Sequence, residues 1–113
     1  MEYQIAINGD TFEARLSESI TFSDLDGFRA MVKRMIDSNS DSNIVDLSDV
    51  EFIDSAGLGM LLLARDEISK RSSSLTLKSP QGQVQRMFSV ARFEQMFDIE
   101  NKKANSGKTS GSE

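Results

Sequence analysis

Polar and apolar residues alternate in two stretches near the start of the chain, residues 3–8 and residues 11–16. Every second residue of the second stretch, starting at Phe12, is apolar, which is typical of a strand that buries one face. A glycine–aspartate pair at residues 9–10 is a turn signal between them. This pattern predicts a hairpin or two adjacent strands.

Apolar residues then recur at helical spacing in three longer segments. Thr21 or Ser23 can cap the first helix, and residues 21–24 resemble a capping box. The second helix is predicted at about residues 56–69 and is apolar nearly all round at its start, which is typical of burial on more than one side. The third starts at residues 79–80. The apolar faces of the first and third helices are formed by Leu25, Phe28, Val32, Met35, Ile36, Val84, Met87, Phe88 and Ala91.

Two short segments, IVDL at residues 44–47 and LTL at residues 75–77, are predicted as strands between the helices, the first of them buried. Residues 93–99 close the core and can supply a last short strand. Strands that alternate with helices imply crossover connections and a mainly parallel sheet. The sequence therefore predicts one α/β domain over residues 1–100, with four or five strands and three or four helices. Residues 101–113 are small and polar without apolar periodicity, and we expect a disordered tail.

Composition narrows the classes of function. The 113 residues carry a formal net charge of −5, so we expect no nucleic-acid partner and a partner with a basic face. The absence of cysteine and histidine excludes disulfides, thiolate nucleophiles and the commonest general base. No signal-peptide pattern occurs, and the longest uncharged apolar stretch, residues 56–64, is too short to cross a bilayer. We expect a cytoplasmic protein without membrane insertion and without a cofactor.

The most distinctive segment is residues 50–62, VEFIDSAGLGMLL, where a strand-like run gives way to the second helix. Ser55 lies at the predicted start of this helix, where free backbone N–H groups and the helix dipole favour a negative charge such as a phosphate. Serine is also a favoured N-cap, but Asp54 can fill that role. Gly57 and Gly59 weaken a helix, so we expect another group to approach closely there.

Residues 43–59, NIVDLSDVEFIDSAGLG, resemble the bacterial anti-sigma factor antagonists of the STAS family. Residues 75–77, 84–88 and 97–99 fall where that family has its next strand, helix and last strand. The resemblance therefore covers about residues 3–100. It implies a STAS-type fold and a regulatory protein that is not an enzyme.

The resemblance also implies a phosphorylation cycle at Ser55. In the family, an anti-sigma factor that is a serine kinase of the histidine-kinase-like ATPase type phosphorylates this serine, and a metal-dependent, PP2C-like serine phosphatase reverses the reaction. The unphosphorylated form binds the kinase and frees what the kinase holds, whereas the phosphorylated form does not bind. The partner-binding residues that the resemblance implies are Asp54, Ala56, Gly57, Leu58, Ser19, Ile20 and Thr21.

Residues 18–21 depart from the family, which often has Gly-Glu-Leu-Asp or a close variant at this point, whereas this chain has ESIT. Ile20 keeps the apolar position, and Thr21 replaces the acidic cap with another capping residue. In the family this loop lies beside the phosphoserine and touches the partner. The departure leaves the fold prediction unchanged and the identity of the partner open.

Other classes of function remain as alternatives. A receiver domain with Asp46 as phosphoacceptor shares the strand–helix alternation, but residues 8–10 supply only one acid and Lys78 matches the required lysine only loosely. An enzyme is disfavoured because the sequence has no phosphate-binding loop and no serine–histidine pair. A STAS domain can also act as a scaffolding or sensing subunit of a transport or stress-signalling complex.

A metal site is the last alternative, because four acidic residues lie close together in the sequence. They partly alternate along a strand, so their side chains diverge, whereas a metal site needs oxygen ligands that converge. We expect a solvated acidic surface formed by Asp46, Asp49, Glu51 and Asp54.

Overall fold

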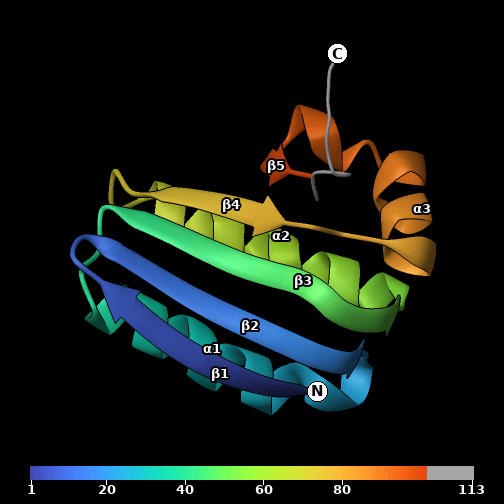
Figure 1. Ribbon diagram of the computed structural model, residues 1–113, viewed down its shortest axis with the longest axis horizontal. Helices are drawn as coiled ribbons and strands as arrows, with labels where there is room; N and C mark the ends of the chain where they lie inside the picture. Colours follow the sequence, from blue (N-terminus) through green and yellow to red (C-terminus); the bar gives the residue numbers. More distant parts are fainter. Residues whose placement is uncertain (102–113) are drawn as a thin grey trace.

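The computed structural model describes residues 1–101, in which strands and helices alternate along most of the chain (Figure 1). The strands are β1 (Glu2–Asn8), β2 (Thr11–Ile20), β3 (Ser42–Ile53), β4 (Ser74–Lys78) and β5 (Asp98–Glu100). The helices are α1 (Leu25–Asp37), α2 (Ser55–Ser69) and α3 (Gly82–Val90), with short 3₁₀ turns η1 (Phe22–Asp24) and η2 (Phe93–Gln95). Most of the predicted tail, residues 102–113, lies outside the described residues.

The strands form one five-stranded sheet in the order β1-β2-β3-β4-β5. β1 and β2 pair antiparallel through the turn at Gly9, and the other neighbouring pairs are parallel. Figure 1 shows α1 and α2 on the same face of the sheet, with α3 beyond the end of β3. The predicted α/β fold with a mainly parallel sheet is therefore confirmed.

β2 and β3 extend further than the sequence pattern predicted. The predicted strands ended at residues 16 and 47, but pairing continues to Ile20 and Ile53 after register shifts that follow Arg15 and Glu18. These irregularities interrupt the alternation of side chains while the backbone pairing persists. The segment 48–53 is therefore strand and not a lead-in to the helix, and residues 18–20 are strand and not loop.

The core lies between the sheet and the α1–α2 layer. The predicted inward face of β2 is confirmed, because Phe12, Ala14 and Leu16 are all buried. Near the end of the described chain, the Phe93 ring stacks on Phe88 and makes a tilted contact with Phe97, with centroids 4.8 Å apart in both pairs. The largest fully buried side chains are Phe12, Phe88, Phe93, Leu16, Ile20, Met31, Met35, Leu47, Ile53, Leu61, Ile68 and Leu77.

The opposite face of the sheet carries charged side chains, and Asp46 corrects the expectation of a solvated acidic surface. This residue is buried in the middle of β3. Its Oδ1 accepts a hydrogen bond from the Ser48 N–H at 2.9 Å, and its Oδ2 lies 3.6 Å from Arg15 Nε. Asp46 therefore satisfies the backbone where β2 and β3 shift register, whereas Asp49 and Glu51 are exposed as expected.

The predicted capping box is confirmed, and it caps the 3₁₀ turn η1 that leads into α1. Asp24 Oδ2 accepts hydrogen bonds from the Thr21 N–H at 2.8 Å and from the Thr21 hydroxyl at 3.2 Å. Its Oδ1 accepts a hydrogen bond from the terminal ammonium group of Met1 at 3.0 Å. Partial burial disfavours the charged form of Asp24, but these partners outweigh burial and hold the pKa of its carboxyl below the ordinary value.

We expect Asp24→Ala to lower the free energy of unfolding at neutral pH by about 1 kcal/mol, the usual effect of losing a cap. Because the pKa of Asp24 is lower in the folded state, its stabilisation is complete above about pH 4 and is lost as the pH falls through the folded pKa. Urea denaturation of both proteins at a series of decreasing pH values should therefore show converging stabilities. A stability difference that is independent of pH would contradict this role of the charge.

Candidate functional site

Asp54 connects the start of α2 to the segment that follows β2. Its Oδ1 accepts a hydrogen bond from the Gly57 N–H at 2.8 Å, and its Oδ2 accepts one from the Phe22 N–H at 3.2 Å. Its own N–H donates to the Ile20 carbonyl at 3.2 Å. Asp54 is therefore the N-cap of α2, and the predicted capping role is confirmed.

Ser55, the first residue of α2, is exposed, and its hydroxyl has no hydrogen-bond partner among residues 1–101. Because Asp54 already caps the helix, the Ser55 side chain is not needed for that purpose. Within the same residues, the backbone N–H groups of Ser55 and Ala56 also lack a protein acceptor. An anion on the Ser55 oxygen would meet these free donors and the positive end of the helix dipole.

Gly57 is buried, and it makes the close approach that its sequence position predicted. A Cβ atom added there would lie 2.5 Å from the Ile20 carbonyl oxygen and 2.6 Å from Ile53 Cγ1. The approaching group therefore belongs to the same chain and is not a partner protein. At Gly59 nothing lies within 4 Å of an added Cβ, and nothing in the structure explains the glycine.

The structure brings the two halves of the predicted site together. Ile20 and Thr21 lie beside Asp54 because β2 and β3 end in register and the Asp54 carboxylate reaches Phe22. Two predicted residues, Ile20 and Gly57, are buried and can act only by shaping the surface. The others are at least partly accessible, namely Ser19, Thr21, Asp54, Ala56 and Leu58.

Sequence reasoning missed two residues that belong to this region. Phe22 follows the predicted cap and leaves 71% of its surface exposed, so it is an aromatic side chain beside the start of α2. Its signal in the sequence is an apolar residue outside the apolar stripe of the first helix. Gln83 in α3 exchanges two 2.9 Å hydrogen bonds with the backbone N–H and carbonyl of Ile53. It fixes the end of β3 directly before Asp54, and no pattern in the sequence indicated it.

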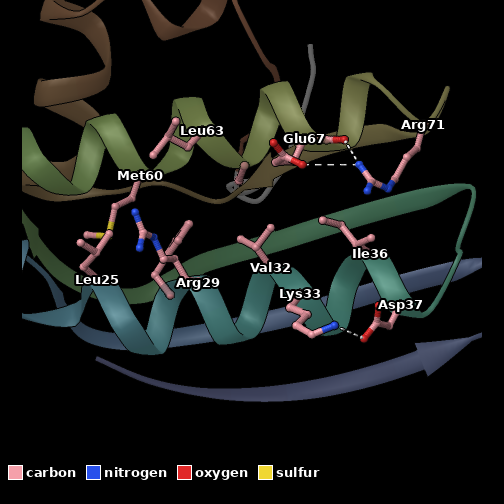
Figure 2. Close-up of a pocket in the computed structure, with 12 residues that line it drawn as sticks. Leu25, Arg29, Val32, Lys33, Ile36, Asp37, Met60, Leu63, Glu67 and Arg71 are labelled. Atoms are coloured by element: carbon pink, nitrogen blue, oxygen red, sulfur yellow. Dashed lines mark hydrogen bonds and ion pairs between the residues drawn. The ribbon is translucent and has the colours of Figure 1, made fainter.

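A groove between α1 and α2 begins close to this region and follows the two helices (Figure 2). Its volume is about 480 Å³, and the Lys33–Asp37 and Arg71–Glu67 ion pairs, at 3.2 and 3.5 Å, lie on its walls. The apolar side chains that line it are Leu25, Phe28, Val32, Ile36, Met60, Leu63 and Ala64. Leu63 is 56% exposed, so α2 is less completely buried than its sequence predicted.

The receiver-domain alternative does not fit this geometry. Asp46 lies inside β3 and not at a strand end, and its carboxylate is buried against Arg15 and Ser48. Lys78 pairs with Glu13 at 3.5 Å. Across residues 1–101, no group of three or more acidic side chains is arranged to hold a metal ion, and no helix has the length and hydrophobicity to span a membrane.

Comparisons with known proteins identify the family. The family model for the STAS domain matches residues 2–106, and the chain belongs to this family. A STAS-domain-containing protein of Pseudomonas aeruginosa is 36% identical over 56 residues, which are 50% of this chain and 55% of that protein. The chain thus spans about half the length of this relative.

Solved structures agree on the fold. An anti-sigma factor antagonist from Mycobacterium paratuberculosis superposes with a TM-score of 0.80 at 15% identity, covering 89% of this chain and 86% of that one. The phosphorylated form of the Bacillus cell fate determinant SpoIIAA superposes with a TM-score of 0.68 at 17% identity, covering 89% and 93%. The fold of this chain is therefore the fold of anti-sigma factor antagonists.

We expect Gly57→Ala to lower the free energy of unfolding by about 1 to 3 kcal/mol, because the added methyl group overpacks the contact with Ile20 and Ile53. The matched control is Gly59→Ala, which has open space around the new methyl group and should stabilise α2 by up to about 1 kcal/mol. Urea denaturation of both variants measures the difference. Equal effects of the two substitutions would contradict a packing role that is specific to Gly57.

Proposed function

We propose that this protein is a partner-switching regulator, an anti-sigma factor antagonist controlled by reversible phosphorylation of Ser55. The observation that carries the proposal is the exposed Ser55 hydroxyl at the start of α2, beside free N–H groups, while Asp54 alone caps the helix. The chain offers no histidine to activate this hydroxyl, so it suits the role of a substrate for another protein's active site.

The proposed partner is an anti-sigma factor with serine kinase activity of the histidine-kinase-like ATPase type. It supplies ATP, magnesium and the catalytic base, and a PP2C-like phosphatase removes the phosphate. In its unphosphorylated form the protein presents the start of α2 and the adjoining end of β2 to this kinase. Phe22, whose backbone N–H is bound by Asp54, provides an exposed aromatic side chain of the kind that dominates binding energy at interfaces.

Phosphorylation changes the charge of this surface without requiring a new fold. A phosphate adds about −1.5 to −2 charges at neutral pH, and the N–H groups of Ser55 and Ala56 are available to it. At the interface, the same charge lies next to Asp54 and faces the nucleotide phosphates of the kinase. Like-charge contacts at an interface cost several kcal/mol, and about 3 kcal/mol weakens binding more than a hundredfold.

The first test of the switch is binding of Ser55 variants to the candidate kinase. Ser55→Ala should retain binding, whereas Ser55→Asp should weaken it about a hundredfold through the added charge. Ser89→Asp is the matched control, because Ser89 is exposed on α3 and this substitution should leave the affinity unchanged. Isothermal titration calorimetry gives the affinities, and equal affinities for the Ala and Asp variants of Ser55 would overturn the mechanism.

The second test is the chemistry of the phosphate. After incubation with candidate histidine-kinase-like ATPases from the same cell, mass mapping should place the phosphate on Ser55, and Ser55→Ala should remain unlabelled. The label should survive hydroxylamine, because a serine phosphoester lacks the reactive acyl bond of a phosphoaspartate. A hydroxylamine-labile label, or full labelling of Ser55→Ala, would reject Ser55 as the phosphoacceptor.

A scaffolding or sensing subunit is the second candidate function, and the groove between α1 and α2 is the observation that favours it. A pocket of about 480 Å³ that is lined by apolar side chains together with charged ones has the size and the mixed lining of small-molecule sites. Affinity purification discriminates between the two functions. Recovery of a kinase and a phosphatase supports the switch, whereas recovery of a permease and an ATPase supports the transport-associated role.

A further inference from the structure

The two edges of the sheet are built very differently. β5 has three residues, two of which, Asp98 and Glu100, are exposed acids that discourage pairing with another strand. β1 has seven residues, and after Glu2 it carries no charge, no proline and no bulge. Natural sheets protect their edges from pairing with charges, prolines, bulges or very short strands. The β1 edge lacks this protection beyond Glu2, and this bare edge requires an explanation.

The outer edge of β1 is unpaired in the part of the chain that the structure describes. β1 pairs with β2 on one side, and its other side has no strand partner among residues 1–101. Ile7 leaves 57% of its surface exposed, although it lies on the same face of β1 as Tyr3 and Ile5, which pack against the core. An exposed isoleucine in an unpaired strand is suited to cross-strand contact with a further strand.

We propose that a second copy of this chain pairs with the edge of β1, antiparallel and symmetric about Ile5. The sequence of β1 is complementary to itself in this register, which pairs all seven residues. On the core-facing side, Ile5 opposes its own copy and Tyr3 opposes Ile7, which gives apolar and aromatic cross-strand pairs. On the other face Gln4 opposes Ala6, and at the ends Glu2 opposes Asn8, so no like charges meet.

The symmetry of this pairing limits the assembly to a dimer. An antiparallel pair of identical strands is related by a twofold axis, and it uses the single bare edge of each copy. The remaining edges are the short acidic β5 strands, so the joined sheet of two copies does not extend further. The β1 edge is separate from α2, so the dimer does not depend on the proposed role of Ser55 and leaves both hydroxyls accessible.

Cysteine cross-linking tests the register directly, because the natural chain contains no cysteine. Opposed residues of antiparallel strands have Cα atoms about 4.5 to 5.5 Å apart, which a disulfide can span. Gln4→Cys mixed with Ala6→Cys should therefore form a disulfide-linked heterodimer on mild oxidation, in higher yield than either variant alone. Both positions are exposed, so the substitutions spare the core. Gln4→Cys mixed with Val90→Cys, which is 81% exposed on α3, is the control and should yield only background.

Light scattering on the purified protein tests the assembly itself. The mass should rise from 12.6 kDa toward twice that value as the concentration increases from micromolar to millimolar. Ile7→Lys should hold the protein at the monomer mass, because it removes the apolar pair with Tyr3 and adds a lysine to the edge, a charge that natural sheets use to block edge pairing. Val90→Lys should dimerise like the natural chain. A monomer at all concentrations, a dimer that tolerates Ile7→Lys, or cross-linking no better than the Val90 control would overturn the proposal.

Discussion

The contact between the end of β2 and the first turn of α2 is the constraint on which the site depends. Gly57 packs so close to the Ile20 carbonyl that no side chain fits between them. Asp54 reinforces this contact, because one carboxylate oxygen caps α2 and the other holds the Phe22 N–H. The end of β2 at Ile20 and the start of α2 at Ser55, which are 35 residues apart in the sequence, therefore form one surface, and the start of α2 is fixed in position relative to β2.

This constraint leaves the Ser55 hydroxyl available for the phosphorylation that we propose. In many helices a serine at the start is occupied as the cap, and its hydroxyl is bonded to the backbone. Here the residue before it performs the capping, with an acidic side chain that is also tied to η1. The Ser55 hydroxyl projects from a helix end whose position is already determined, so a phosphate there changes the charge of the surface without removing any contact that holds α2 in place.

The sequence predicted the fold well because the strongest patterns coincide with the core. The alternation around Phe12 and the helical spacing from Leu25 to Ile36 reflect burial on one face, because the buried positions of these elements are occupied by apolar side chains. The longer extent of β2 and β3 could not be predicted, since the pairing persists through register shifts that disrupt the alternation. The burial of Asp46 could not be predicted for a related reason. Its partners, Arg15 and the Ser48 N–H, are brought to it by the pairing of β2 with β3.

At the site, the sequence indicated which residues were unusual but not what they contact. Gly57 was expected to allow a close approach, and the structure assigns that approach to Ile20 in the same chain. Phe22 remained unnoticed because exposure is a property of the folded surface and leaves no periodic signal in the sequence. The same limit applies to Ile7, which reads as one more apolar residue of an alternating strand. Only the strand order shows that Ile7 belongs to an edge strand, β1, which within residues 1–101 pairs with β2 alone. For such residues, the information about function lies in the arrangement of the elements and not in the local pattern.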